Sequence, residues 1–168
     1  MNMDNIRKMV YTALLISLSI VIPLTFSFLA IQIGPFTATL ASHVPMFLSM
    51  FLGPLASVMV GIGSGLGFFI TKGAYVGARA LMHSIVGMFG AYLIQREVSY
   101  FKVVISTSFV HGIAEALVVI PFGITFKSIL ITVGLGTVLH HLVDGILAYG
   151  VIRILSRVLK LQLIKNNL

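Results

Sequence analysis

Residues 36–69 read FTATLASHVPMFLSMFLGPLASVMVGIGSGLGFF, and this stretch decides the fold. It holds two apolar runs that meet at Gly53-Pro54, and it contains no Asp, Glu, Lys or Arg. The whole chain of 168 residues is 58% hydrophobic and 9% charged, with a mean hydropathy of +1.10. So few polar groups cannot cover a surface that faces water. We therefore expect an all-α integral membrane protein.

The length sets the number of membrane spans. One spanning helix needs roughly 20 apolar residues, so the chain has room for about six spans in one compact transmembrane domain over residues 1–168. The expected spans are approximately 9–29, 42–53, 55–71, 75–95, 101–122 and 128–156. Run 42–53 is too short to cross upright. Segment 30–41 contains Gly34-Pro35, and we expect a loop folded over the outer mouth as a lid, because lipid cannot satisfy its backbone groups.

The Lys and Arg positions predict the orientation, because cytoplasmic loops carry an excess of them. No cleavage site of small residues follows the first apolar run, so we expect a retained first helix with its N-terminus inside. The C-terminus is then also cytoplasmic, and only Lys72 and Lys127 fall in outer loops. The expected cytoplasmic residues are Arg7, Lys8, Arg96, Lys102, Arg153, Arg157, Lys160 and Lys165. The net charge of +7 thus indicates membrane topology and attraction to anionic lipid, and no nucleic-acid partner is expected.

Ionisable side chains inside the expected spans are the candidate functional residues, because they are costly in lipid. They form three stripes, each on one span: Arg79 with His83, His111 with Glu115, and His140 with Asp144. Facing lipid would leave all of them unsatisfied, so we expect the stripes to converge on a cavity in the outer half of the bundle. No acid lies within one turn of Arg79, which makes a bound anion its expected partner; the alternative is that Arg79 snorkels to the headgroups.

The same stripes have structural interpretations. The His–Glu and His–Asp pairs at i, i+4 are also suited to joining helices, and His140, His141 and Asp144 remain undecided between function and structure. His141 must point about 100° away from His140, which favours packing. Histidines beside carboxylates also suit a metal, but no spacing matches a strong ligand pattern such as HExxH. We expect no metal and no cofactor.

Small residues indicate close helix contacts. The Gly-rich run 61–67 lacks the Gly-Lys-Ser/Thr of a phosphate loop, so a nucleotide site is not expected. On a helix, Ser57, Gly61 and Gly65 form one ridge and Gly63 with Gly67 another, which lets neighbouring backbones approach. The first span has a similar strip through Ala13 and Ser17, suited to docking another membrane protein.

The short second helix, the lid-like loop, six spans in 168 residues and the run 36–69 together resemble the S component of an energy-coupling factor vitamin transporter. The resemblance covers essentially the whole chain. It implies a multi-pass protein of the cell membrane that captures a vitamin from outside and then joins a transmembrane T component and two cytoplasmic ATPases. In that family a small-xxx-small pattern on the first helix, commonly Ala-x-x-x-Ala, contacts the T component. Ala13 and Ser17 match it here, with a hydroxyl as the departure.

The stretches ASHVPMF (41–47), RALMHS (79–84) and HGIAEALVVIPF (111–122) are most similar to the niacin-type members. Nicotinate is a small anion with an aromatic ring, and a guanidinium suits its carboxylate in a two-pronged ion pair. The expected substrate-binding residues are Arg79 for the carboxylate, His83 or His43 as donors, Tyr75, Phe36 and Phe68 on the ring, and Glu115 with His111.

Alternatives stay open. Another S component, for pantothenate or a tryptophan-like substrate, shares the same fold. A stand-alone membrane enzyme or a proton-conducting bundle would use the His, Glu and Asp stripes as a relay. A purely structural scaffold would have no need of the buried charges. The chain carries no ATP-binding motif, so we expect it not to be an enzyme itself and any energy to come from the partners.

Overall fold

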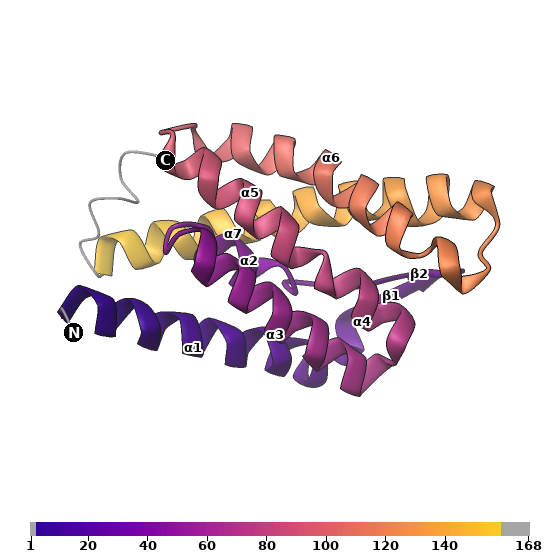
Figure 1. Cartoon of the computed structure of the whole chain (residues 1–168), viewed down its shortest axis with the longest axis horizontal. Helices are drawn as coiled ribbons and strands as arrows, with labels where there is room; N and C mark the ends of the chain where they lie inside the picture. The colour runs from indigo at the N-terminus through magenta and orange to yellow at the C-terminus, as the bar shows by residue number, and fades with distance from the viewer. Residues whose placement is uncertain (1–2, 159–168) are drawn as a thin grey trace.

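The computed structural model describes residues 3–158 as a bundle of long helices with one small β-hairpin (Figure 1). The longer helices are α1 (Met3–Thr25), α3 (Pro54–Lys72), α4 (Ala74–Leu81), α5 (His83–Gln95), α6 (Tyr100–Val118) and α7 (Gly136–Val158). Between them lie α2 (Val44–Met50), the 3-10 turns η1 (Ser27–Leu29) and η2 (Ile120–Phe122), and the π-helix η3 (Ser128–Leu135). The N-terminal end of α1 and the C-terminal end of α7 lie at the same end of the bundle.

Within residues 3–158, five helical stretches are long and apolar enough to cross a membrane. They are Asn5–Thr25, Pro54–Lys72, Ala74–Gln95, Tyr100–Phe122 and Ser128–Arg157. The last four agree closely with the expected spans, whereas the first ends at Thr25 rather than near residue 29. The expected second span is only the seven-residue α2, so six full crossings are not found in the described part of the chain. The helical bundle itself is as expected.

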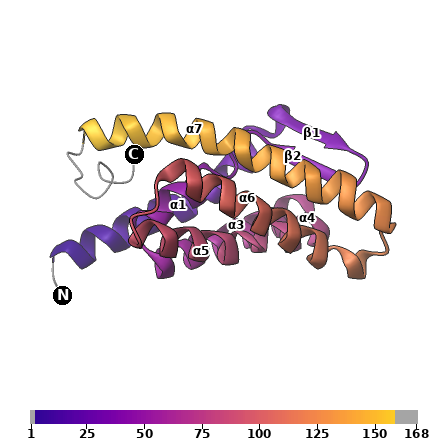
Figure 2. The same cartoon turned by 90° about the horizontal axis from the view of Figure 1, so that it is seen from above.

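The expected lid loop is a β-hairpin. β1 (Ala30–Ile33) pairs antiparallel with β2 (Phe36–Thr39), and Gly34 turns the chain with a φ of 55°. The segment expected to be a loop is therefore a paired two-stranded hairpin, and the pairing satisfies the backbone groups that lipid would leave unpaired. Its role as a lid stays a prediction. Figure 2 shows the hairpin beside α7, toward the end of the bundle away from the chain termini. Its inner strand β2 begins and ends on buried residues, whereas β1 is exposed throughout.

The small-residue ridges of α3 pack as predicted. A Cβ added at Gly61 would overlap the backbone of Ser84 on α5, and one at Gly63 would lie 2.6 Å from the side chain of Ile16 on α1. One ridge of α3 therefore lies against α5 and the other against α1. Both contacts need residues without side chains, because the neighbouring helix occupies the space that a Cβ would take.

The outward faces of the long helices are apolar. Exposed leucines and isoleucines cover them, including Leu14 and Leu18 on α1 and Leu139, Ile146 and Ile154 on α7. A surface of that kind suits hydrocarbon rather than water. The described basic residues of the expected cytoplasmic set lie near the start of α1, in or beside the turn from α5 to α6, or near the end of α7, while Lys72 ends α3 and Lys127 directly precedes η3. Lys160 and Lys165 fall outside the described residues, and the cytoplasmic orientation stays a prediction.

Candidate functional site

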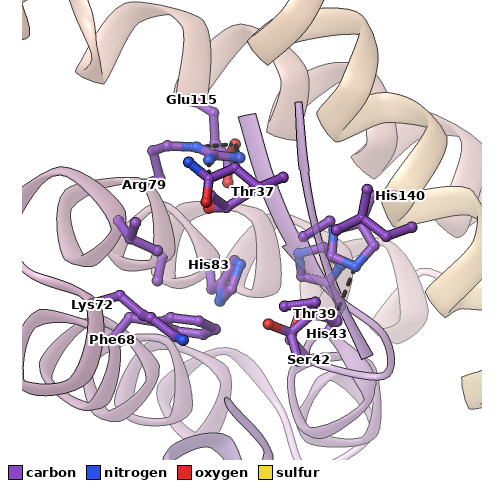
Figure 3. Close-up of a pocket in the computed structure, with 16 residues that line it drawn as sticks. Thr37, Thr39, Ser42, His43, Phe68, Lys72, Arg79, His83, Glu115 and His140 are labelled. Atoms are coloured by element: carbon purple, nitrogen blue, oxygen red, sulfur yellow. Dashed lines mark hydrogen bonds and ion pairs between the residues drawn. The ribbon is translucent and has the colours of Figure 1, made fainter. Parts of the chain in front are cut away.

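A cavity of about 300 Å³ lies between the hairpin and the helix ends that face it (Figure 3). This volume suits a small organic molecule. Ten of the sixteen lining residues are polar or charged, although the surrounding bundle is apolar. Its lining residues are Ala30, Ile31, Gln32, Thr37, Ala38, Thr39, Ser42, His43, Phe68, Lys72, Val76, Arg79, Ala80, His83, Glu115 and His140.

Arg79 forms the centre of one wall, and its partner is Glu115 on α6. Nε and Nη2 of Arg79 lie 2.8 and 2.7 Å from the same oxygen, Oε2 of Glu115. Nη1 donates to the hydroxyl of Thr37 on the hairpin at 3.2 Å. Arg79 is 4% exposed, so it does not snorkel. Its own helix α4 carries no acid, and the acid that pairs with it comes from another helix. A bound anion as a further partner of Arg79 stays a prediction.

The guanidinium and the carboxylate are held from several sides. The ring centroids of Phe36 and Tyr75 lie 5.2 and 5.8 Å from Cζ of Arg79, at cation–π distance. The hydroxyl of Thr137 donates to Oε2 of Glu115, and Nε2 of His111 lies 3.3 Å from Oε1. Both charges are therefore fixed in position without any ligand.

Asp144 is the second buried acid, and it anchors the chain between the hairpin and α2. Its two oxygens accept hydrogen bonds from the backbone N–H groups of Ala41 at 2.8 Å and His43 at 3.0 Å. Ala41 has a φ of 68°, a conformation that residues with a Cβ rarely adopt. Nδ1 of His43 and Nε2 of His140 lie 3.1 and 3.2 Å from Oδ2. Of the undecided residues, Asp144 thus has a clear structural role, since it holds this turn on α7.

All five histidines of the chain gather around His43. The ring centroids lie 4.8 Å away for His83, 4.8 Å for His111, 4.4 Å for His140 and 5.6 Å for His141. His141 is fully buried and contacts Phe47, with a hydrogen bond between its Nε2 and Thr107 at 2.9 Å, as the packing interpretation expects. Two groups have ligand atoms close enough for a metal ion: His43 with His83 and His111, and His43 with His140 and Asp144.

The structure brings most of the predicted site residues to the cavity. Its lining includes Arg79, His83, His43, Glu115 and Phe68. Tyr75, Phe36 and His111 do not line it. Phe36 packs against Gly136 of α7, Tyr75 packs against Phe122 at 5.3 Å, and His111 is fully buried behind Glu115.

Sequence reasoning missed several polar lining residues. Gln32, Thr37 and Ser42 lie in or beside the hairpin, and Lys72 ends α3. Gln32 and Thr37 are polar residues of segment 30–41, which is expected to cover the mouth, and Ser42 directly follows that segment. The sequence predicts Lys72 only as a charge in an outer loop. It reaches the cavity because α3 ends there with Lys72 as its last residue.

The predicted docking residues lie on α1. Ala13 and Ser17 are both exposed, and the Ser17 hydroxyl donates to the Ala13 carbonyl at 3.0 Å. The hydroxyl is thereby satisfied within the helix, and the strip remains small. Docking of a T component on it stays a prediction.

A comparison with curated proteins finds the niacin transporter NiaX of Lactococcus lactis subsp. cremoris (strain MG1363). The two sequences are 35% identical over 169 residues, which cover 90% of this chain and 76% of that protein. No family model matches the sequence, and no solved structure matches the fold.

Proposed function

This chain belongs to the niacin-type S components of energy-coupling factor vitamin transporters, and from that premise we propose that it captures nicotinate from outside the cell. It is a multi-pass protein of the plasma membrane. Its relative is a transporter, which supports uptake rather than catalysis as the role of this chain. The observation that carries the proposal is the buried guanidinium of Arg79 in the wall of a small cavity roofed by the hairpin.

The carboxylate of nicotinate binds between two cations of the cavity wall. Arg79 directs Nε and Nη2 to Glu115, so Nη1 is the end of its guanidinium that remains for a ligand beside Thr37. Glu115 offsets the charge of Arg79, and the uncompensated positive charge comes from Lys72, which has no ion pair among residues 3–158. A negatively charged ligand is therefore favoured over a neutral one of the same shape.

The pyridine ring occupies the space toward the histidines. Phe68 supplies an aromatic face in the lining, and His43 and His83 present ring nitrogens to the same cavity. A pyridine nitrogen accepts a hydrogen bond from an imidazole N–H. The polar wall thus has a group for each polar end of nicotinate.

Uptake follows from the covering hairpin and the partners. The hairpin opens to admit the vitamin and closes over it, which excludes water and strengthens the ion pair in the low dielectric of the cavity. The small-residue strip Ala13 and Ser17 of α1 docks on a transmembrane T component. Two cytoplasmic ATPases on that component supply the energy for release inside.

The test is a calorimetric titration of the purified chain in detergent with nicotinate, nicotinamide and pantothenate. We expect nicotinate to bind best and nicotinamide to bind at least about 30-fold more weakly, because a lost buried charge-assisted contact is worth about 2 kcal/mol or more. Equal affinity for nicotinate and nicotinamide would contradict the carboxylate site. Preference for pantothenate would assign a different vitamin.

A variant pair separates binding from folding. Replacing Arg79 alone leaves Glu115 as an unpaired buried charge, and such a charge lowers the stability of the folded protein even without any effect on binding. The double change Arg79→Gln with Glu115→Gln removes both charges together, and we expect it to stay folded while losing nicotinate binding. Arg157→Gln, at the exposed far end of α7, is the matched control and keeps full affinity.

A further inference from the structure

We propose that His43, His83 and His111 bind a divalent transition-metal ion such as zinc, with one coordination position of the metal open to the vitamin cavity. The three residues come from three different segments: the turn before α2, the start of α5 and the middle of α6. Each is at most 3% exposed, and two of them line the cavity.

The three rings converge as the ligands of one ion do. One ring nitrogen of each histidine lies within 4.8 Å of those of the others. The centroid distances are 4.8, 4.8 and 5.0 Å, and the ring planes cross at 85°, 77° and 75°. Histidines that share a tetrahedral zinc at 2.0–2.1 Å have centroids about 5 Å apart, so the ion needs only small ring movements.

A polar atom of another residue lies close to Nδ1 of each ring. Nδ1 of His43 lies 3.1 Å from Oδ2 of Asp144, that of His83 lies 2.9 Å from the Ser64 hydroxyl, and that of His111 lies 3.0 Å from Nδ1 of His141. Nε2 of His111 is buried without a hydrogen bond, and so is Nδ1 of His43, which meets Asp144 only as a close charge contact. Nε2 of His43 and Nε2 of His83 have no hydrogen-bond partner among the described residues either. Histidines that ligate metals are typically held in this way, with the other ring nitrogen bonded to a carboxylate or another polar group.

An unsatisfied atom points to the same ligand. Nε2 of His111 is enclosed and makes no hydrogen bond, with Oε1 of Glu115 3.3 Å away. A buried polar atom without a partner costs about 1–3 kcal/mol. Metal coordination would satisfy this nitrogen.

The charges around the three histidines also favour a divalent cation. Glu115 is paired with Arg79, whereas Asp144, which lies 3.1 Å from Nδ1 of His43, has no Lys or Arg partner among the described residues. Together with Lys72 in the cavity lining, these groups sum to zero charge when the histidines are neutral, and a divalent ion adds two positive charges beside the cavity. The added charge strengthens the attraction for a monovalent anion.

The second group of possible ligands is already occupied. Nε2 of His140 lies between the Thr39 carbonyl, at 3.2 Å, and the Asp144 carboxylate. Both oxygens of Asp144 accept backbone N–H groups. A metal at His43, His140 and Asp144 would have to break these contacts, which favours the group with free Nε2 atoms.

The open position gives the metal a role in recognition, and this step rests on the proposed function. His43 and His83 line the cavity, so an ion that they hold with His111 lies in its wall. Pyridine nitrogen and carboxylate oxygen are both ligands of zinc-type ions. The pyridine nitrogen therefore completes the coordination, in place of a direct hydrogen bond from an imidazole, and the carboxylate reaches Arg79 and Lys72.

The test is a Co²⁺ titration of the full chain in detergent, purified with a tag that contains no histidine and stripped with a chelator. We expect one Co²⁺ per chain, with the visible absorption of a cobalt ion in low coordination. His83→Gln and His111→Gln abolish the signal, whereas His140→Gln retains it as the matched control. Nicotinate added to the cobalt form shifts the absorption bands.

Thermal unfolding of each variant checks that it is folded. Should His83→Gln not fold, Ser64→Ala removes only the partner of Nδ1, and we expect it to weaken Co²⁺ binding about 10-fold or more. No Co²⁺ binding, or a signal lost in His140→Gln and kept in His83→Gln, would overturn the site. Nicotinate binding in calorimetry with unchanged cobalt bands would overturn the open position. Cobalt bound at these histidines without nicotinate binding would support the metal site and contradict the proposed function.

Discussion

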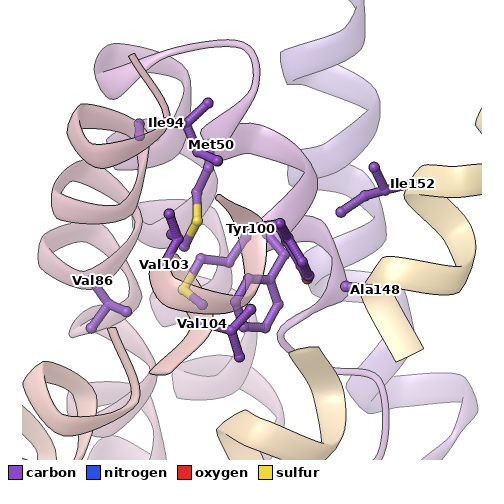
Figure 4. Packing of buried hydrophobic residues seen from close by; sticks show 11 residues of the cluster. Met50, Val86, Ile94, Tyr100, Val103, Val104, Ala148 and Ile152 are labelled. Atoms are coloured by element: carbon purple, nitrogen blue, oxygen red, sulfur yellow. The ribbon is translucent and has the colours of Figure 1, made fainter. Parts of the chain in front are cut away.

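The bundle has two halves that differ in the side chains they bury. The terminal half, around the ends of α5 and α7 and the start of α6, is packed with apolar side chains (Figure 4). The hairpin half contains Arg79, Glu115, Asp144 and all five histidines, beside a small apolar cluster of Val119, Ile129 and Val133. In the terminal half, the buried Tyr100 hydroxyl donates to the Gly145 carbonyl at 2.9 Å.

The difference in buried side chains between the two halves distinguishes residues needed for folding from residues needed for function. The terminal half is stabilised by burial and packing, which any apolar set of the right volume provides. Buried charges offer no such gain, because their desolvation offsets most of their attraction. The hairpin half therefore retains its ion pairs for positioning and binding. If this is right, substitutions in the two halves should have different kinds of effect.

Asp144→Ala should have the largest effect of any single replacement in this comparison. It leaves the N–H groups of Ala41 and His43 without acceptors, at about 1–3 kcal/mol each, so we expect a loss of about 2–6 kcal/mol in the free energy of unfolding. Unfolding in mixed detergent micelles measures it. Asp144→Asn keeps one acceptor oxygen and should lose less. Equal stability of wild type and Asp144→Ala would break the distinction between the halves.

Gly61→Ala tests the contact between α3 and α5, next to the hairpin half. An added Cβ meets the backbone of Ser84, which cannot rotate away, so we expect a loss of about 1–3 kcal/mol. Gly150→Ala is the matched control, because nothing lies within 4 Å of its added Cβ and alanine favours the helix by up to about 1 kcal/mol. Similar unfolding curves for the two variants would contradict the close approach of α3 and α5.

The terminal half and the helix contacts were predictable from local sequence. Apolar runs separated by Gly and Pro located four of the five long stretches, and the spacing of Gly61, Gly63 and their neighbours indicated close contacts, because both features depend on residues near in sequence. The hairpin does not follow from the local sequence, since Gly34-Pro35 indicates a turn but not the two strands beside it. Its strand pairing depends on residues up to nine positions apart.

The sequence predicts which residues form the site, but not which of them contact one another. Residue type and membrane depth identify Arg79, His83 and Glu115, because an ionisable side chain inside a membrane costs free energy and is usually functional. Which acid meets Arg79 depends on how α4 and α6 pack, 36 residues apart in sequence, and no periodicity reports that. The three-histidine group also depends on the packing of distant segments. Its ligands come from three segments and therefore match no short motif.

Ile152→Val should have the smallest effect on the free energy of unfolding, and it tests the terminal half of the comparison. Ile152 is fully buried in the terminal half, and removing one methyl group there costs about 0.5–1.5 kcal/mol. The cavity lining contains no residue of this cluster, so nicotinate affinity should stay at the wild-type value while the unfolding midpoint falls. Calorimetric titration beside an unfolding curve measures both in one preparation. A drop in affinity that matches the drop in stability would mean that the apolar half also sets the shape of the site, and the two halves would then have to be treated as one coupled unit.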